Sequence, residues 1–225
     1  MKVNNISQNF GARIIVNDSL KKALEGIGEA VQLGNFDNVP EFINAINLIK
    51  ETEDFDTFEI QAQTPEEYEK RYYHSDKYAF EIKTDGKPVK CENRPAFSHY
   101  GGHQGSRAIG GIIQFAKEYL NLNSDNLKIT KAHQNFKEIN ADIAKHQKSM
   151  DDLRSRAEAV GLYISRCAIG LAYDVDEVEE GRELLKAINL AIKEEEKEIS
   201  KLRLAQHEAR WQTTFEYKPI IDELM

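Results

Sequence analysis

Apolar positions between Lys131 and Trp211 follow the longest regular pattern in the chain. They recur at alternating spacings of three and four, the spacing by which one helix packs along another. The first half of this stretch carries Phe136, Ile139, Ile143, Met150, Leu153, Ala157, Val160 and Ile164. The second half carries Leu185, Ile188, Ile192, Ile199, Leu202 and Ala209. The pattern predicts two long helices that pack on each other.

A polar turn is predicted at Tyr173-Asp174-Val175-Asp176, between the two apolar patterns. Short connections place neighbouring helices antiparallel. A turn near Val175 would put Met150 beside Ile199, and Ile139 beside Trp211. The alternative is a turn at Gly161, which would shift every pair and leave three helices.

The preceding residues alternate between helical and strand patterns. Asn17 or Asp18 is expected to cap a helix that Gly34 ends, and Pro40 opens the next helix. Asp85-Gly86 predicts a two-residue hairpin turn, because both positions favour positive φ. The expected strands are 11–16, 57–63, 78–84 and 87–91, with a short helix over 64–72.

These patterns predict an α+β fold with a small, mostly antiparallel sheet, followed by a long antiparallel helical hairpin. We expect an α+β domain at 1–127, the hairpin at 128–212 and a tail at 213–225. The tail looks β-like, because Phe215, Tyr217 and Ile221 alternate, and Pro219 would limit its pairing. We expect it to dock back on the N-terminal domain.

Composition narrows the class of protein. The chain has 225 residues and a formal net charge of −8, which argues against direct nucleic-acid binding. Two cysteines, Cys91 and Cys167, are too few for a disulfide scaffold. No signal peptide is expected, and the apolar run 157–173 is shorter than a membrane span and contains Arg166. A cytoplasmic protein without membrane association is the expectation.

The most unusual local composition is a glycine- and histidine-rich segment before a helix expected from about Ser106 to Leu120. Glycines let a backbone approach a ligand closely, and a helix N-terminus attracts anions. A phosphate or carboxylate site is therefore one interpretation. A flexible turn with Ser106 as helix cap is the simpler one, because no Lys follows the glycines as in a P-loop. The candidate ligand-binding residues are His99, Gly101, Gly102, His103, Gly105, Ser106 and Arg107.

Metal binding has little support in the sequence. Cys91, His74, His99 and His103 are residue types that suit zinc, but their spacing matches no zinc signature. No metal and no cofactor are expected. Cys167 is expected in the core, and His146 falls on the seam as a satisfied or partly exposed interhelical histidine.

An acidic cluster follows the predicted turn, with members Asp174, Asp176, Glu177, Glu179, Glu180 and Glu183. Asp176 and Glu179 have the spacing of a capping box, and acidic groups in a first turn favour the helix dipole. The functional alternative is an acidic tip that binds a basic surface on a partner. Glu194, Glu195 and Glu196 are expected on a solvated helix face with neighbouring lysines.

The sequence carries no strong catalytic motif, so an enzyme is not favoured. We expect a protein-binding module whose partner is another protein with a basic surface, with self-association as a further option. An inhibitor of a nucleic-acid-handling protein, encoded by a phage or mobile element, is one such module. The alternative is a ligand-binding protein or enzyme that uses the glycine-rich segment 101–111.

Overall fold

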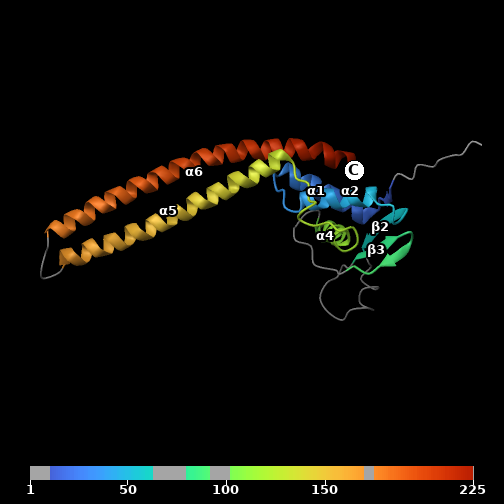
Figure 1. Ribbon diagram of the computed structural model, residues 1–225, viewed down its shortest axis with the longest axis horizontal. Coiled ribbons are helices and arrows are strands. Elements are labelled where there is room, and N and C mark those ends of the chain that lie inside the picture. The colour runs from blue at the N-terminus through green and yellow to red at the C-terminus, as the bar shows by residue number, and fades with distance from the viewer. Residues whose placement is uncertain (1–10, 63–79, 92–101, 170–174, 225) are drawn as a thin grey trace, which may run out of the picture. The chain divides into compact units, whose positions relative to one another are not determined.

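The computed structural model describes residues 11–62, 80–91, 102–169 and 175–224 (Figure 1). Its contacts divide the chain into two compact units. Unit 1 comprises Met1–Thr130 and Thr214–Met225, and unit 2 comprises Lys131–Thr213. The fold is α+β with a helical hairpin, as the sequence predicts. The short helix expected over 64–72 lies outside the described residues.

Unit 1 contains a four-stranded sheet in the order β1 (Arg13–Ile15), β2 (Thr57–Ala62), β3 (Phe80–Thr84), β4 (Lys87–Val89). β1 pairs parallel with β2, and the other two pairs are antiparallel. The prediction of a mostly antiparallel sheet is confirmed. β1 and β4 are therefore its two edges within the described residues.

The turn between β3 and β4 has the predicted geometry. Asp85 and Gly86 have φ values of 50° and 72°, as a two-residue hairpin turn requires. The Asp85 carboxylate also accepts hydrogen bonds from the backbone N–H groups of Asp56 at 2.9 Å and Thr57 at 2.8 Å. One side chain thereby fixes both this turn and the start of β2.

Helix α1 (Asp18–Gln32) begins and ends where its capping residues predict. Asn17 Oδ1 accepts from the backbone N–H of Leu20 at 3.0 Å, and Gly34 follows the helix with a φ of 67°. Helix α2 (Val39–Glu51) starts with Pro40 in its first turn. Its buried Asn44 donates to the Lys128 carbonyl at 2.7 Å and accepts from the Lys128 N–H at 3.1 Å. This pair fixes the polar segment that precedes the hairpin.

Helix α4 (Gly102–Tyr119) packs against α1, α2, β2 and β3. The rings of Phe115 and Phe58 lie 5.0 Å apart. A Cβ at Gly111 would lie 3.1 Å from Ile60 Cδ1, so this glycine lets α4 approach the sheet closely.

The expected start of α4 at Ser106 is wrong, because Gly102 and Gly105 already belong to the helix. Packing of its buried residues offsets the low helix propensity of glycine.

The C-terminal segment is helical, so its β-like interpretation is wrong. Helix α6 (Val175–Leu224) continues through Pro219 almost to the chain end. The buried residues are Thr213, Thr214, Tyr217 and Ile221, which share a helix face at spacings of three to four. Within unit 1, the Tyr217 ring lies 6.0 Å from that of Phe36, and Thr214 Oγ1 donates to the Val31 carbonyl at 3.1 Å. Burial raises the pKa of the Tyr217 phenol to about 12.

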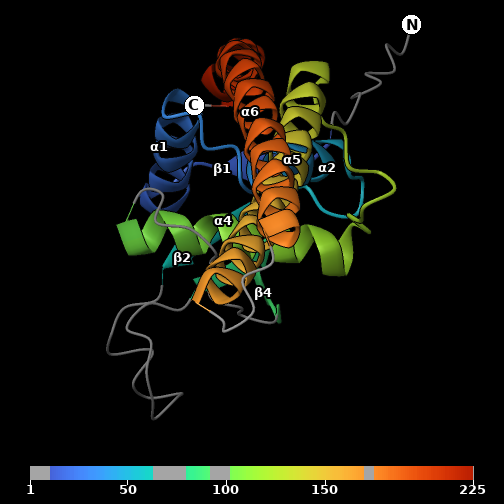
Figure 2. The ribbon, with the colours of Figure 1, turned by 90° about the vertical axis from the view of Figure 1, so that its left-hand side faces the viewer.

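In unit 2, α5 (Lys131–Ile169) and α6 lie side by side (Figures 1 and 2). Because α5 continues through Gly161, a turn at that residue is excluded. The predicted seam is confirmed, since the half-buried or buried side chains recur at heptad spacing. On α5 they include Phe136, Ile139, Ile143, His146, Met150, Leu153, Ala157, Val160 and Ile164. On α6 they include Val178, Leu185, Ile188, Ile192, Glu195, Ile199, Leu202 and Ala209.

The register of the two helices differs from the predicted one. Gln206 Nε2 donates to Asn140 Oδ1 at 2.6 Å, so Ile139 lies near the level of Gln206 and not of Trp211. Ser149 Oγ donates to Glu195 Oε1 at 2.8 Å, which gives a closely similar register near the middle of the hairpin. The shift arises because α5 ends at Ile169, several residues before the predicted turn.

The register can be checked by chemical cross-linking. In a background with Cys91→Ser and Cys167→Ser, the pair Asn140→Cys/Gln206→Cys should react with a short thiol-specific cross-linker within one chain. The pair Ile139→Cys/Trp211→Cys should react poorly, because five residues of helix separate the levels by roughly 7 Å. Peptide mapping of the product measures both, and preferential cross-linking of the second pair would contradict the observed register.

The packing of the α6 terminus predicts a stability difference between two aromatic residues of one helix. Tyr217 is 2% exposed, whereas Phe215 is 69% exposed. Tyr217→Ala should lower the free energy of unfolding by about 3–5 kcal/mol, the range for truncating a buried aromatic residue. Phe215→Ala should cost much less. Urea denaturation measures both, and equal losses would contradict this packing.

Candidate functional site

A polar cluster interrupts the apolar seam near the middle of the hairpin. Glu195 accepts a hydrogen bond from Ser149 Oγ at 2.8 Å on one carboxylate oxygen, and its other oxygen lies 2.6 Å from His146 Nδ1. Hydrogen bonds with His146 and then Ser149 lower the pKa of the Glu195 carboxyl. His146 is therefore a paired interhelical histidine, as predicted. Glu195 does not lie on a solvated face as expected, because it occupies a seam position.

The hydrogen bonds of this cluster connect the two helices and are not arranged as a catalytic relay. In a nucleophile–base–acid arrangement, the hydroxyl would donate to the imidazole. Here Ser149 and His146 both contact Glu195, so the carboxylate joins two residues of α5 to α6. Polar groups in a coiled-coil seam fix the register of the helices. The cluster accounts for the alignment of α5 with α6.

The hairpin tip, defined here as residues 162–167 and 175–184, contains a second set of cross-helix contacts. A Cβ on Gly181 would lie 2.8 Å from Ile164 Cγ1, so glycine allows the two helices to approach closely there. Tyr163 donates from its hydroxyl to Glu177 Oε2 at 3.1 Å, and Cys167 Sγ lies 3.9 Å from the same oxygen. Hydrogen bonds with Cys167 and Glu177 raise the pKa of Tyr163 to about 12. Glu177 thus joins α6 to α5.

The acidic residues of the predicted partner-binding cluster have different environments. Because α6 already begins at Val175, Asp176 lies inside the first turn and the expected capping box at Asp176 is wrong. Glu183 pairs with Lys186 one turn later on α6. Glu179 and Glu180 have exposed side chains. Asp174 lies outside the described residues.

Large apolar side chains lie exposed beside these carboxylates. Leu162 and Tyr163 on α5, and Val175 and Leu184 on α6, are 48–57% exposed. Leucines are also exposed farther along α6, at Leu190 and Leu204. Among the described residues, only the hairpin tip presents exposed large apolar side chains from both helices. Apolar surface beside charged groups is typical of interaction sites.

The glycine-rich segment is only partly described. Gly102, His103, Gly105, Ser106 and Arg107 belong to the first turns of α4. Arg107 is half-buried. His99 and Gly101 lie outside the described residues, as does His74. The phosphate or carboxylate site on this segment stays a prediction.

The part of the chain that the structure describes contains neither a metal-binding cluster nor a helix that could span a membrane. Within it, no three His, Cys, Asp or Glu side chains are grouped so that they would hold a metal ion. None of its helices combines the length and the apolar character that crossing a membrane requires. Cys167 is half-buried at the hairpin tip and not in a core as expected.

Comparison with known proteins finds no matching family model, no matching curated protein and no matching solved structure. Sequence reasoning missed Leu162, Tyr163 and Leu184 as exposed apolar residues. Their positions outside the heptad seam were the available signal, because the seam uses Val160, Ile164 and Leu185 in this region.

The seam cluster predicts a pH dependence of stability. The folded state lowers the pKa of Glu195 below its ordinary value of 4.5, so the ionised carboxylate stabilises the hairpin above that pH. This stabilisation is lost as the pH falls through the lowered folded-state pKa. Glu195→Ala should therefore destabilise the protein at pH 7, and the difference from the wild type should shrink in acid.

Urea denaturation monitored by circular dichroism between pH 7 and pH 3 measures this difference. Glu158→Ala is the matched control, because Glu158 lies exposed on α5. A loss for Glu195→Ala that stays constant with pH, or that equals the control, would contradict a stabilising role of the carboxylate charge.

Proposed function

We propose that this protein is a non-enzymatic protein-binding module whose hairpin tip binds a basic surface on another protein. The observation that carries the proposal is the combination of exposed carboxylates with exposed apolar side chains from both helices at the tip. The apolar groups would supply buried area, and the carboxylates would supply orientation and attraction to the partner.

The cross-helix contacts at the tip support this proposal because they leave a preorganised surface. Gly181 brings the helices together, and Glu177 is held by Tyr163. A surface that is already ordered loses less conformational entropy on binding. Glu179 and Glu180 then remain as the exposed acidic groups that approach the partner.

The partner that best fits an acidic tip is a protein that handles nucleic acids. Proteins that handle nucleic acids carry basic grooves for phosphate backbones, and an acidic projection fits such a groove. Occupying the groove would inhibit nucleic-acid binding by competition. An inhibitor encoded by a phage or mobile element would act in this way.

The test uses the full chain and a partner isolated with it by affinity capture. Glu179→Lys/Glu180→Lys should weaken binding of the purified partner by about tenfold or more at low salt, because attraction becomes repulsion. The loss should be smaller at high salt, since screening reduces the charge interaction. Isothermal titration calorimetry at two ionic strengths measures both effects.

Two control variants separate the tip from the rest of the hairpin. Glu158→Lys/Glu208→Lys makes the same change of net charge at exposed positions outside the tip and should bind normally. Leu184→Ser should weaken binding, whereas Leu190→Ser should not. Equal losses in tip and control variants would reject the tip as the binding surface. Light scattering that shows the chain to be its own partner would reject the proposed basic partner.

A further inference from the structure

The two edges of the sheet in unit 1 differ in chemistry. β4 carries Lys87 and Pro88, and natural proteins use such residues to prevent pairing with further strands. β1 carries Ile14 and Ile15, and Val16 follows with 58% of its surface exposed. An edge strand with two consecutive isoleucines and without Pro or Gly is suited to pairing with another strand.

The register of β1 shows which backbone groups face its outer edge. The N–H of Arg13 donates to the Asp56 carbonyl at 2.8 Å, beside the parallel pairing of Ile14 with Phe58. Successive residues of a strand direct their N–H and C=O groups to opposite sides. Arg13 and Ile15 therefore bond toward β2, whereas the N–H and C=O groups of Ile14 point away from it. No other strand among the described residues pairs with that side.

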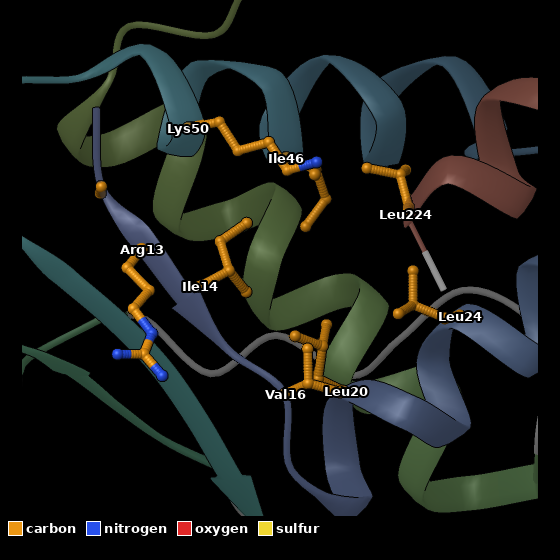
Figure 3. A pocket seen from close by; sticks show the side chains of 9 residues that line it. Arg13, Ile14, Val16, Leu20, Leu24, Ile46, Lys50 and Leu224 are labelled. Carbon is orange, nitrogen blue, oxygen red and sulfur yellow. The ribbon is translucent and has the colours of Figure 1, made fainter. Parts of the chain in front are cut away.

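A cavity of about 290 Å³ adjoins this edge (Figure 3). β1, α1, α2 and the end of α6 contribute its walls, all within unit 1. Its walls are mainly aliphatic and include Ile14, Val16, Leu20, Leu24, Ile46 and Leu224. A volume of this size accommodates one or two aliphatic side chains of a ligand. Strand pairing and side-chain insertion would therefore occur at the same place.

Two cations border the cavity. Figure 3 shows the Lys50 side chain extending along α2 toward Ile46, and Arg13 directed away from the cavity on β1. Among the ion pairs of the described residues, neither Lys50 nor Arg13 takes part.

Gly11, which precedes β1, packs unusually closely against the backbone of Lys50 on α2. Gly11 has a φ of 52°, and a Cβ there would lie 1.4 Å from the Lys50 carbonyl oxygen. Only glycine fits this position. The close contact fixes β1 beside the C-terminal end of α2, so the strand edge and the cavity are ordered before any ligand binds.

We propose that the outer edge of β1 and the adjoining cavity bind an extended, acidic peptide strand of a partner protein. Backbone groups of the peptide pair with the N–H and C=O of Ile14, as in other β-strand additions. One aliphatic side chain of the peptide enters the cavity. Neighbouring side chains of a strand alternate between its two faces, so carboxylates next to the aliphatic residue lie on the opposite face, near Arg13. Carboxylates two residues away lie on the same face as the aliphatic side chain, near Lys50.

The test uses a seven-residue peptide with one central Val, Glu at the other positions and a fluorescent label, so that carboxylates lie on both faces of the bound strand. The wild-type chain should bind it, and a peptide with Lys in place of Glu should bind at least tenfold more weakly. Lys50→Glu should weaken binding of the Val/Glu peptide by tenfold or more. Ile14→Pro should do the same, because proline removes the N–H that faces the peptide and leaves the bonds to β2 in place. Fluorescence anisotropy measures the affinities.

Lys87→Glu is the matched control, because it makes the same charge change on the opposite edge strand and should leave binding unchanged. Thermal melts identify any variant that unfolds, and Lys50→Glu keeps the test decisive if Ile14→Pro does. Absence of binding to the wild type, or equal affinities in wild type and Lys50→Glu, would overturn the proposal. Slow hydrogen exchange at the Ile14 amide without peptide would also overturn it, since the chain itself would then cover the edge.

Discussion

Two helices packed side by side cover each other's apolar stripes only in part, and this constraint governs unit 2. Most of the seam side chains remain half-buried, and Ile143, Val178, Ile188 and Ile199 are among the few that are buried. Half-buried leucines and isoleucines tolerate several registers at similar energy. Directional contacts are needed to select one register, and hydrogen bonds across the seam provide them. Asn140 with Gln206, and Glu195 with His146 and Ser149, serve this purpose.

Unit 1 differs from the hairpin, because its helix α4 is enclosed on several sides. It packs against α1, α2, β2 and β3. Ile112, Phe115 and Ala116 are buried between the sheet and the neighbouring helices, and Gly111 lets α4 approach Ile60. The last turns of α6 add Tyr217 and Ile221 to this unit. A core that is enclosed on several sides fixes its surface features rigidly, which is what a strand edge needs to act as a template.

Patterns in the sequence predicted those elements whose signal is local. The heptad spacing predicted the seam, and Asp85-Gly86 predicted the β3–β4 turn, because each depends on a few neighbouring residues. The tail was misassigned because Phe215, Tyr217 and Ile221 fit a strand, while Tyr217 and Ile221 also share a helix face. Tertiary packing decided between the two. Glu195 was misassigned because three consecutive glutamates look solvated, although the spacings of three and four from Ile192 to Glu195 and from Glu195 to Ile199 place it on the seam.

The candidate surfaces were harder to predict, because they depend on which residues the fold leaves uncovered. The acidic residues of the tip could be recognised from the sequence composition. The hydrogen bond from Tyr163 to Glu177 could not, because it depends on how the two helices pair. The β1 edge gave no composition signal at all. Its cavity combines residues as far apart in sequence as Ile14 and Leu224.

The two proposed surfaces require different kinds of partner. In the hairpin tip, the backbone is helical up to the helix ends and is not extended, so the tip binds a partner mainly through its side chains and cannot add a strand to a sheet edge. The β1 edge offers backbone donors and acceptors, and it therefore needs a partner segment in extended conformation. The acidic tip of a second copy has the right charge for Lys50 and Arg13, but its helical backbone cannot pair with Ile14 as an extended strand does. Charge complementarity between the surfaces is thus insufficient for self-association through them, and an extended segment from elsewhere must supply the missing hydrogen bonds.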